Sequence, residues 1–112
     1  MKTIQLPKKV LEDLPEIKDQ IVRMEYIKGD KRKPIGVILK TKEGYYGWSL
    51  CNSKDKWDRN LGVKKAFYRT RKKLNSEDVL FNIRFNFIFG NRISYFESAF
   101  EAISTEWNDK DD

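Results

Sequence analysis

Few side chains in this chain could carry catalysis. Its 112 residues include no histidine and one cysteine, Cys51. Imidazole acid–base chemistry, histidine-dependent nucleophiles and a cysteine-rich zinc site are therefore excluded. Carboxylates or lysines remain. The candidate carboxylates are Asp55 and Asp58, one helical turn apart, and Glu43 before them. Such a group could hold a divalent cation for a nuclease.

The same carboxylates have simpler roles. Asp55 suits the positive end of a helix dipole, and Asp58 can pair with basic neighbours on a helix. Cys51 falls in a strand pattern, which predicts a buried thiol rather than a reactive one. We therefore expect a protein that is not an enzyme, with no metal and no cofactor.

Basic side chains concentrate in the middle of the chain. The formal net charge is +6, but residues 41–74 hold ten basic and three acidic groups, net +7, whereas residues 75–112 hold three and eight, net −5. Lysines and arginines that contact a polyanion release its counterions, so this region is a candidate nucleic-acid interface. The alternative is a solvated helix face without a partner. The candidate contacts are Lys54, Lys56, Arg59, Lys64, Lys65, Arg69, Arg71, Lys72 and Lys73.

An aromatic strand precedes these basic residues. Over 45–51, Tyr46, Trp48 and Leu50 share one face, which predicts a strand with these side chains in the core. Tyr45 lies on the other face beside Gly47 and is the better candidate for stacking on a nucleic-acid base.

A basic helix should follow the strand. Asn52 suits an N-cap, with Asp55 three residues later, so we expect the helix to begin there. Val63, Ala66, Phe67, Thr70 and Leu74 fall on one apolar face. Lys65, Arg69 and Lys72 fall roughly opposite and should be exposed. Trp57 and Leu61 lie off the apolar face, which predicts a bend at Gly62 or a helix that touches two neighbours.

The remaining elements complete an α+β fold. A helix after Pro7, interrupted at Pro15, should precede strands over 21–27 and 35–41, which continue into 45–51 through a hairpin loop at 42–44. Alternation of Phe81, Ile83, Phe85, Phe87 and Phe89 predicts a further strand, with Phe81 and Phe85 buried.

A capping box at Ser94–Glu97 predicts a C-terminal helix with an apolar stripe of Phe96, Phe100, Ile103 and Trp107. We thus expect a single domain over 1–112: an antiparallel sheet of about four strands with the basic helix and the C-terminal helix packed on it. The acidic tail 108–112 should be mobile.

The chain contains no run of 18 apolar residues, so we expect no membrane span. Its first residues lack the apolar segment of a signal peptide, and a single cysteine fits a reducing compartment. These features favour the cytoplasm.

The order helix, three strands, basic helix over 7–74 resembles the double-stranded RNA-binding domain. Lys64, Lys65 and Ala66 are similar to that family's lysine-lysine-x-alanine run at the start of its second helix, whose lysines contact phosphates. Here we expect eight or more helical residues before the lysines, and the strand and helix expected after residue 74 have no counterpart in that family.

The segment 47–62, GWSLCNSKDKWDRNLG, followed by a helix rich in Lys, Ala and Arg, resembles small uncharacterised proteins encoded by phages and prophages. Those proteins often have Pro at the position of Ser53 and Phe at that of Trp57. The resemblance implies a phage accessory protein in a bacterial cytoplasm. Since such proteins often inhibit host or defence machinery, it adds a second hypothesis: an anti-defence or anti-CRISPR-like inhibitor that binds an acidic host protein. The leading hypothesis remains nucleic-acid binding.

Overall fold

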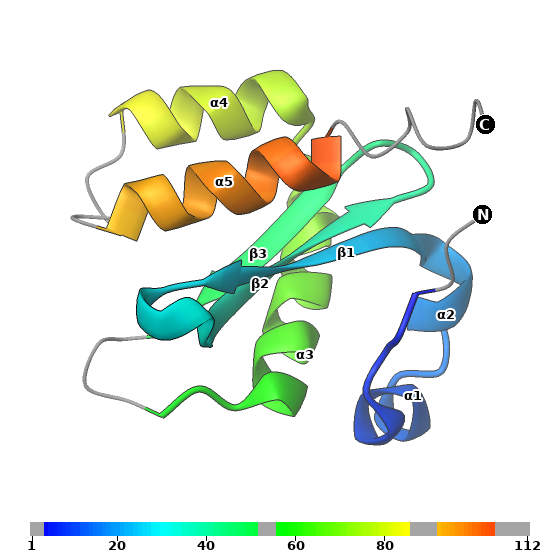
Figure 1. The fold of residues 1–112 in the computed structure, drawn as a ribbon. Coiled ribbons are helices and arrows are strands. Elements are labelled where there is room, and N and C mark those ends of the chain that lie inside the picture. The colour runs from blue at the N-terminus through cyan, green and yellow to red at the C-terminus, as the bar shows by residue number, and fades with distance from the viewer. Residues whose placement is uncertain (1–3, 52–55, 86–91, 105–112) are drawn as a thin grey trace, which may run out of the picture.

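The structure is a computed structural model that describes residues 4–51, 56–85 and 92–104, with the backbone alone for 82–85 (Figure 1). The elements are α1 (Lys8–Asp13), α2 (Ile17–Gln20), β1 (Ile21–Lys28), η1 (Asp30–Arg32), β2 (Pro34–Thr41), β3 (Tyr46–Leu50), α3 (Arg59–Arg69), η2 (Thr70–Lys72), α4 (Ser76–Phe85) and α5 (Ile93–Ser104). η2 is a single 3₁₀ turn, whereas η1 is a tight turn in which Lys31 and Arg32 have positive φ.

The strands form one antiparallel sheet in the order β1-β2-β3. A tight hairpin joins β2 to β3, where the Thr41 amide donates to the Tyr45 carbonyl at 2.8 Å and Gly44 adopts φ +91°. On the outer edge of β3, the Tyr46 amide donates to the Leu74 carbonyl at 2.8 Å. The predicted meander of three strands is therefore confirmed.

Helices cover both faces of the sheet, with α3 on one face and α5 on the other (Figure 1). Successive side chains of β2 point to opposite faces of the sheet, which explains this arrangement. Val37 and Leu39 pack toward α1, α2 and α3, while Ile38 packs toward α5. Each face thus has its own apolar cluster, and the sheet forms the middle layer of a three-layer α+β domain.

Prolines set the limits of the N-terminal helices. Pro7 is the N-cap of α1, and the φ of −60° that its ring fixes is compatible with a helix start. Pro15 separates α1 from α2, as the sequence predicts. Val10 and Ile17 are fully buried and anchor both short helices against the face that also carries α3.

The predicted strand over 81–89 is wrong in its described part, because Phe81–Phe85 form the second half of α4. Asn75 and Asp78 cap this helix reciprocally, with the Asp78 amide donating to Asn75 Oδ1 at 3.0 Å and the Asn75 amide to Asp78 Oδ2 at 2.9 Å. This capping box selects a helix despite the alternating phenylalanines. Phe81 is 63% exposed rather than buried. The sheet has three strands in the described residues, and residues 86–89 lie outside them.

The C-terminal helix is confirmed, with Phe96, Phe100 and Ile103 buried against the sheet. It begins at Ile93, so Ser94 lies in its first turn and is not the N-cap. Trp107 and the tail 108–112 lie outside the described residues. Among the helices that the structure describes, none has the length and apolar character needed to cross a bilayer.

Candidate nucleic-acid interface

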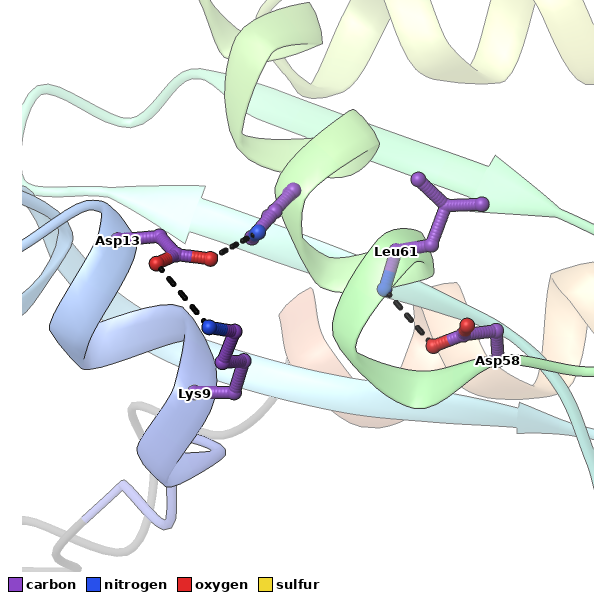
Figure 2. A network of polar contacts seen from close by, with 5 residues as sticks. Lys9, Asp13, Asp58 and Leu61 are labelled. Atoms are coloured by element: carbon purple, nitrogen blue, oxygen red, sulfur yellow. Dashed lines mark hydrogen bonds and ion pairs between the residues drawn. The ribbon is translucent and has the colours of Figure 1, made fainter.

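The basic helix begins later than the sequence predicts. Lys56, Trp57 and Asp58 are not helical, and α3 begins at Arg59. Asp58 is the N-cap, since its Oδ1 accepts a 3.1 Å hydrogen bond from the Leu61 amide (Figure 2). The prediction of a start at Asn52 is wrong because Asp58 satisfies this orphan donor instead. Asn52 and Asp55 themselves lie outside the described residues.

Of the two alternatives predicted at Gly62, the bend is wrong, since α3 runs through this position. The helix does contact two neighbours, the sheet and α1. Trp57 precedes the helix and folds back, so that its indole lies against Gly62, where any side chain would clash with the ring. The same indole contacts Tyr26 of β1 edge-on, with ring centroids 6.5 Å apart. Gly62 therefore serves the packing of Trp57 rather than a change in helix direction.

The predicted apolar face is confirmed at four of its five positions, and the fifth, Leu74, lies beyond η2 and is half-buried. Val63, Ala66, Phe67 and Thr70 are buried against the sheet. The residues of β3 that face this helix are small. One of them is Gly47, which lies against the Ala66 carbonyl oxygen. Ser49, on the same face of β3, donates from its hydroxyl to the Gly62 carbonyl at 2.7 Å. α3 thus packs on the face of β3 that carries Gly47 and Ser49.

Most of the candidate basic residues point to solvent. The exposed ones are Lys56, Arg59, Lys65, Arg69, Arg71, Lys72 and Lys73. Lys54 lies outside the described residues. The predicted exposure of Lys65, Arg69 and Lys72 is confirmed.

Lys64 forms an ion pair within the chain. It is half-buried, and its ammonium donates to Asp13 of α1. Lys9, one turn earlier on α1, lies on the other side of the same carboxylate at 3.7 Å (Figure 2). Asp13, the last residue of α1, thus joins this helix to α3 through Lys64. The hydrogen bond from Lys64, with the smaller contribution of Lys9, lowers the pKa of Asp13 below its ordinary value. The charge of Lys64 is therefore partly neutralised.

Arg69 also has a structural contact. Its Nη1 donates to the Trp48 carbonyl of β3 at 2.9 Å. Since β3 is the edge strand on this side, the guanidinium covers one of its outward carbonyls. Arg69 thus joins α3 to the sheet and is not a pure surface charge.

Tyr68 is a candidate that the sequence reasoning missed. It is 46% exposed, and the Arg71 guanidinium lies over its ring, 5.1 Å from the centroid. Leu61 is 49% exposed on the same side of the helix. We call the set of Leu61, Lys65, Tyr68 and Lys72 the outer row. The spacing of three and four residues between them could have revealed it.

Tyr45, the predicted stacking residue, is half-buried at the hairpin between β2 and β3. Its amide donates to Thr41 Oγ1 at 3.1 Å. The next residue, Tyr46, bridges to Leu74, so Tyr45 lies where η2 ends and not along the outer row.

The turn between β1 and β2 holds a second group of exposed basic residues, which were not predicted as contacts from the sequence. Lys31 and Arg32 both adopt left-handed backbone conformations, with φ of +56° and +60°, and Lys33 follows them. The Tyr95 hydroxyl of α5 donates to Asp30 at 2.5 Å and fixes this turn. That hydrogen bond raises the pKa of Tyr95, because the carboxylate favours the protonated phenol.

Of the three carboxylates that suggested a nuclease, Asp55 lies outside the described residues. Asp58 caps α3, and Glu43 is exposed in the hairpin. In the described ranges, no three carboxylate or cysteine side chains gather as a metal site. Cys51 is half-buried after β3 and not fully buried as predicted.

The element order behind the resemblance to double-stranded RNA-binding domains is present, with α1 and α3 on one face of the meander. Only five residues of α3, 59–63, precede Lys64, fewer than expected. Comparisons of the chain with protein-family models, characterised proteins and solved structures give no match.

Proposed function

We propose that this chain is a non-enzymatic nucleic-acid-binding protein that contacts phosphates through the outward side of α3 and η2. One observation carries the proposal: residues 59–73 contain seven basic and no acidic residues, and the buried side of the helix leaves six of the seven exposed. A solvated helix face in a soluble domain usually mixes both signs of charge.

The spacing of these charges suits a phosphate backbone. Lys65 on α3 and Lys72 in η2 are seven residues apart and both exposed, which places their backbones about 10–12 Å apart along the helix and the turn. The two ammonium groups can therefore contact different phosphates of the same strand. Arg71 and Lys73 flank the row and extend the positive surface. Each contact would release condensed counterions, so that binding would weaken with salt.

A second candidate function is the inhibition of a host or anti-phage defence protein. Leu61 and Tyr68 are about half exposed among the basic residues of the outer row. Tyrosine and arginine are enriched in protein interfaces, and an acidic partner would complement the charge. In either case, the setting that we propose is the cytoplasm of a bacterial host.

The proposal is tested with labelled nucleic acid and a pair of charge-matched variants. Lys65→Gln/Lys72→Gln removes two charges from the outer row, whereas Lys18→Gln/Lys28→Gln removes two exposed charges from α2 and from the end of β1 beside α5. We expect the wild type to bind at about 50 mM salt. The outer-row variant should bind more weakly, and the control should bind nearly as well as the wild type.

Equal weakening by both pairs would show that net charge, and not the outer row, determines binding. Affinity capture from bacterial lysate, with and without nuclease, separates the two functions. A partner lost after nuclease treatment supports nucleic-acid binding. A stoichiometric acidic protein that is retained, together with no affinity for nucleic acid, supports the inhibitor.

A further inference from the structure

We infer that the ligand is single-stranded nucleic acid and that Tyr68 stacks on an unpaired base. This inference rests on the proposed function, because it assigns a ligand class to the same surface. Its starting point is the exposure of Tyr68, which is 46% accessible although it lies next to the buried Phe67. The tyrosine ring therefore projects from a firmly packed part of the helix.

The surroundings of the ring match one nucleotide and its backbone. Lys65 precedes Tyr68 by three residues on α3, about one helical turn away on the same side. Lys72 follows Tyr68 by four residues and is exposed in the 3₁₀ turn η2 at the end of the helix. A base on the ring would have a cation near the phosphate on either side. Exposed aromatic rings among basic groups are the usual means by which proteins hold single strands.

Arg71 extends this platform. Its guanidinium lies over the Tyr68 ring at 5.1 Å from the centroid. Because a guanidinium plane can itself stack on a base, a base can continue the stack on the outer face of Arg71 or contact the part of the Tyr68 ring that stays exposed. Leu61, 49% exposed at the far end of the row, adds apolar surface for a neighbouring base.

A double-stranded ligand would not use these groups. The base faces of a duplex are covered by their stacked neighbours, and duplex phosphates require cations and hydrogen-bond donors only. The half-exposed Tyr68 and Leu61 would then remain in water or against sugar. The combination of apolar and basic side chains in one row therefore favours unpaired bases over a duplex.

The test compares a labelled oligothymidylate of about 15 nucleotides, within the reach of one small domain, with the same strand annealed to oligoadenylate. The variants are Tyr68→Leu, which removes the aromatic ring, and Tyr68→Phe, which keeps it. Phe81→Leu is the matched control, because Phe81 is 63% exposed on α4, and α4 and α3 lie on opposite faces of the sheet (Figure 1). Far-UV circular dichroism confirms that each variant is folded.

We expect the wild type to bind the single strand more tightly than the duplex. Tyr68→Leu should weaken single-strand binding by about fivefold or more, the lower range for loss of one base–aromatic stack. Its salt dependence should stay unchanged, because no charge is removed. Tyr68→Phe and Phe81→Leu should bind like the wild type.

Equal or tighter binding of the duplex, or an unchanged single-strand affinity in Tyr68→Leu, would overturn the inference and leave the proposed function intact. The same is true if Tyr68→Leu weakens both probes equally. Failure of the folded wild type to bind either probe at about 50 mM salt would instead overturn the proposed function itself, and the inference with it.

Discussion

The Ser49 hydroxyl donates a 2.7 Å hydrogen bond to the Gly62 carbonyl across the interface between β3 and α3. Ser49 is 4% exposed, so this bond lies in the interior. One turn further along α3, the Ala66 carbonyl lies against Gly47 of the same strand. These two contacts fix the rotation of the helix about its axis, and Tyr68 must therefore face solvent.

Gly47→Ala should destabilise the protein. The added methyl group would overlap the Ala66 carbonyl oxygen and lie 2.7 Å from the Thr70 backbone nitrogen, so α3 would have to move away from the sheet. Overpacking of this kind costs about 1–3 kcal/mol or more. Ser49→Ala, which removes only the hydrogen bond, should cost about 0.5–1.5 kcal/mol. Urea unfolding measures both, and a Gly47→Ala protein as stable as the wild type would contradict the described docking of α3.

Phe96→Ala and Phe81→Ala should differ strongly in stability. Phe96 is fully buried and meets the Trp48 ring at 5.3 Å between centroids. Its loss should cost about 3–5 kcal/mol. Phe81 is 63% exposed on α4, and its substitution should change the free energy of unfolding by about 0.5 kcal/mol at most. Thermal unfolding compares the two, and a large cost at Phe81 would support the strand that the sequence alternation suggests.

Much of the sheet could be predicted because local signals and tertiary packing agree there. Tyr46, Trp48 and Leu50 alternate, and they do share the face toward α5. Between residues 81 and 85 the two signals disagree, because the alternating phenylalanines indicate a strand while the reciprocal cap of Asn75 and Asp78 starts a helix. Alternation describes burial only if the segment joins a sheet, and here it does not.

The candidate site was predictable in its charges but not in its contacts. Exposure of Lys65 and Lys72 follows from the helical period. The pairing of Lys64 with Asp13 joins residues 51 positions apart, and the contact of Arg69 with Trp48 depends on which strand forms the edge. Such contacts require the tertiary structure. The exposure of Tyr68 also follows from the helical period, because Tyr68 lies three residues after Lys65 and seven after Leu61.

Removal of the Lys64 ammonium should raise the pKa of Asp13. The hydrogen bond from Lys64 is the largest cause that lowers this pKa, and Lys9 contributes less. In Lys64→Gln the pKa of Asp13 should therefore return toward the ordinary value of an aspartate. Lys9→Gln should produce a smaller change in the same direction. NMR titration of the Asp13 carboxyl carbon measures both, and an unchanged pKa in Lys64→Gln would contradict the ion pair.

The same pair predicts how stability depends on pH. Because folding lowers the pKa of Asp13, the pair stabilises the folded state above the ordinary pKa of aspartate. This contribution is lost as the pH falls through the lowered value. Asp13→Asn should therefore show a flatter loss of stability in acid than the wild type does. Urea unfolding at a series of pH values between about 2 and 6 checks this, and identical curves for both proteins would contradict it.

The salt dependence of nucleic-acid binding tests the central claim most directly. Fluorescence anisotropy over a salt series gives the slope of log affinity against log salt for the wild type and for Lys65→Gln/Lys72→Gln. Each phosphate contact contributes about 0.7–0.9 to this slope. If both lysines contact phosphates, the variant should have a slope smaller by about 1.4–1.8, while Lys18→Gln/Lys28→Gln keeps the wild-type slope. An outer-row variant with the wild-type slope, or folded wild-type protein that binds no nucleic acid at about 50 mM salt, would contradict the account.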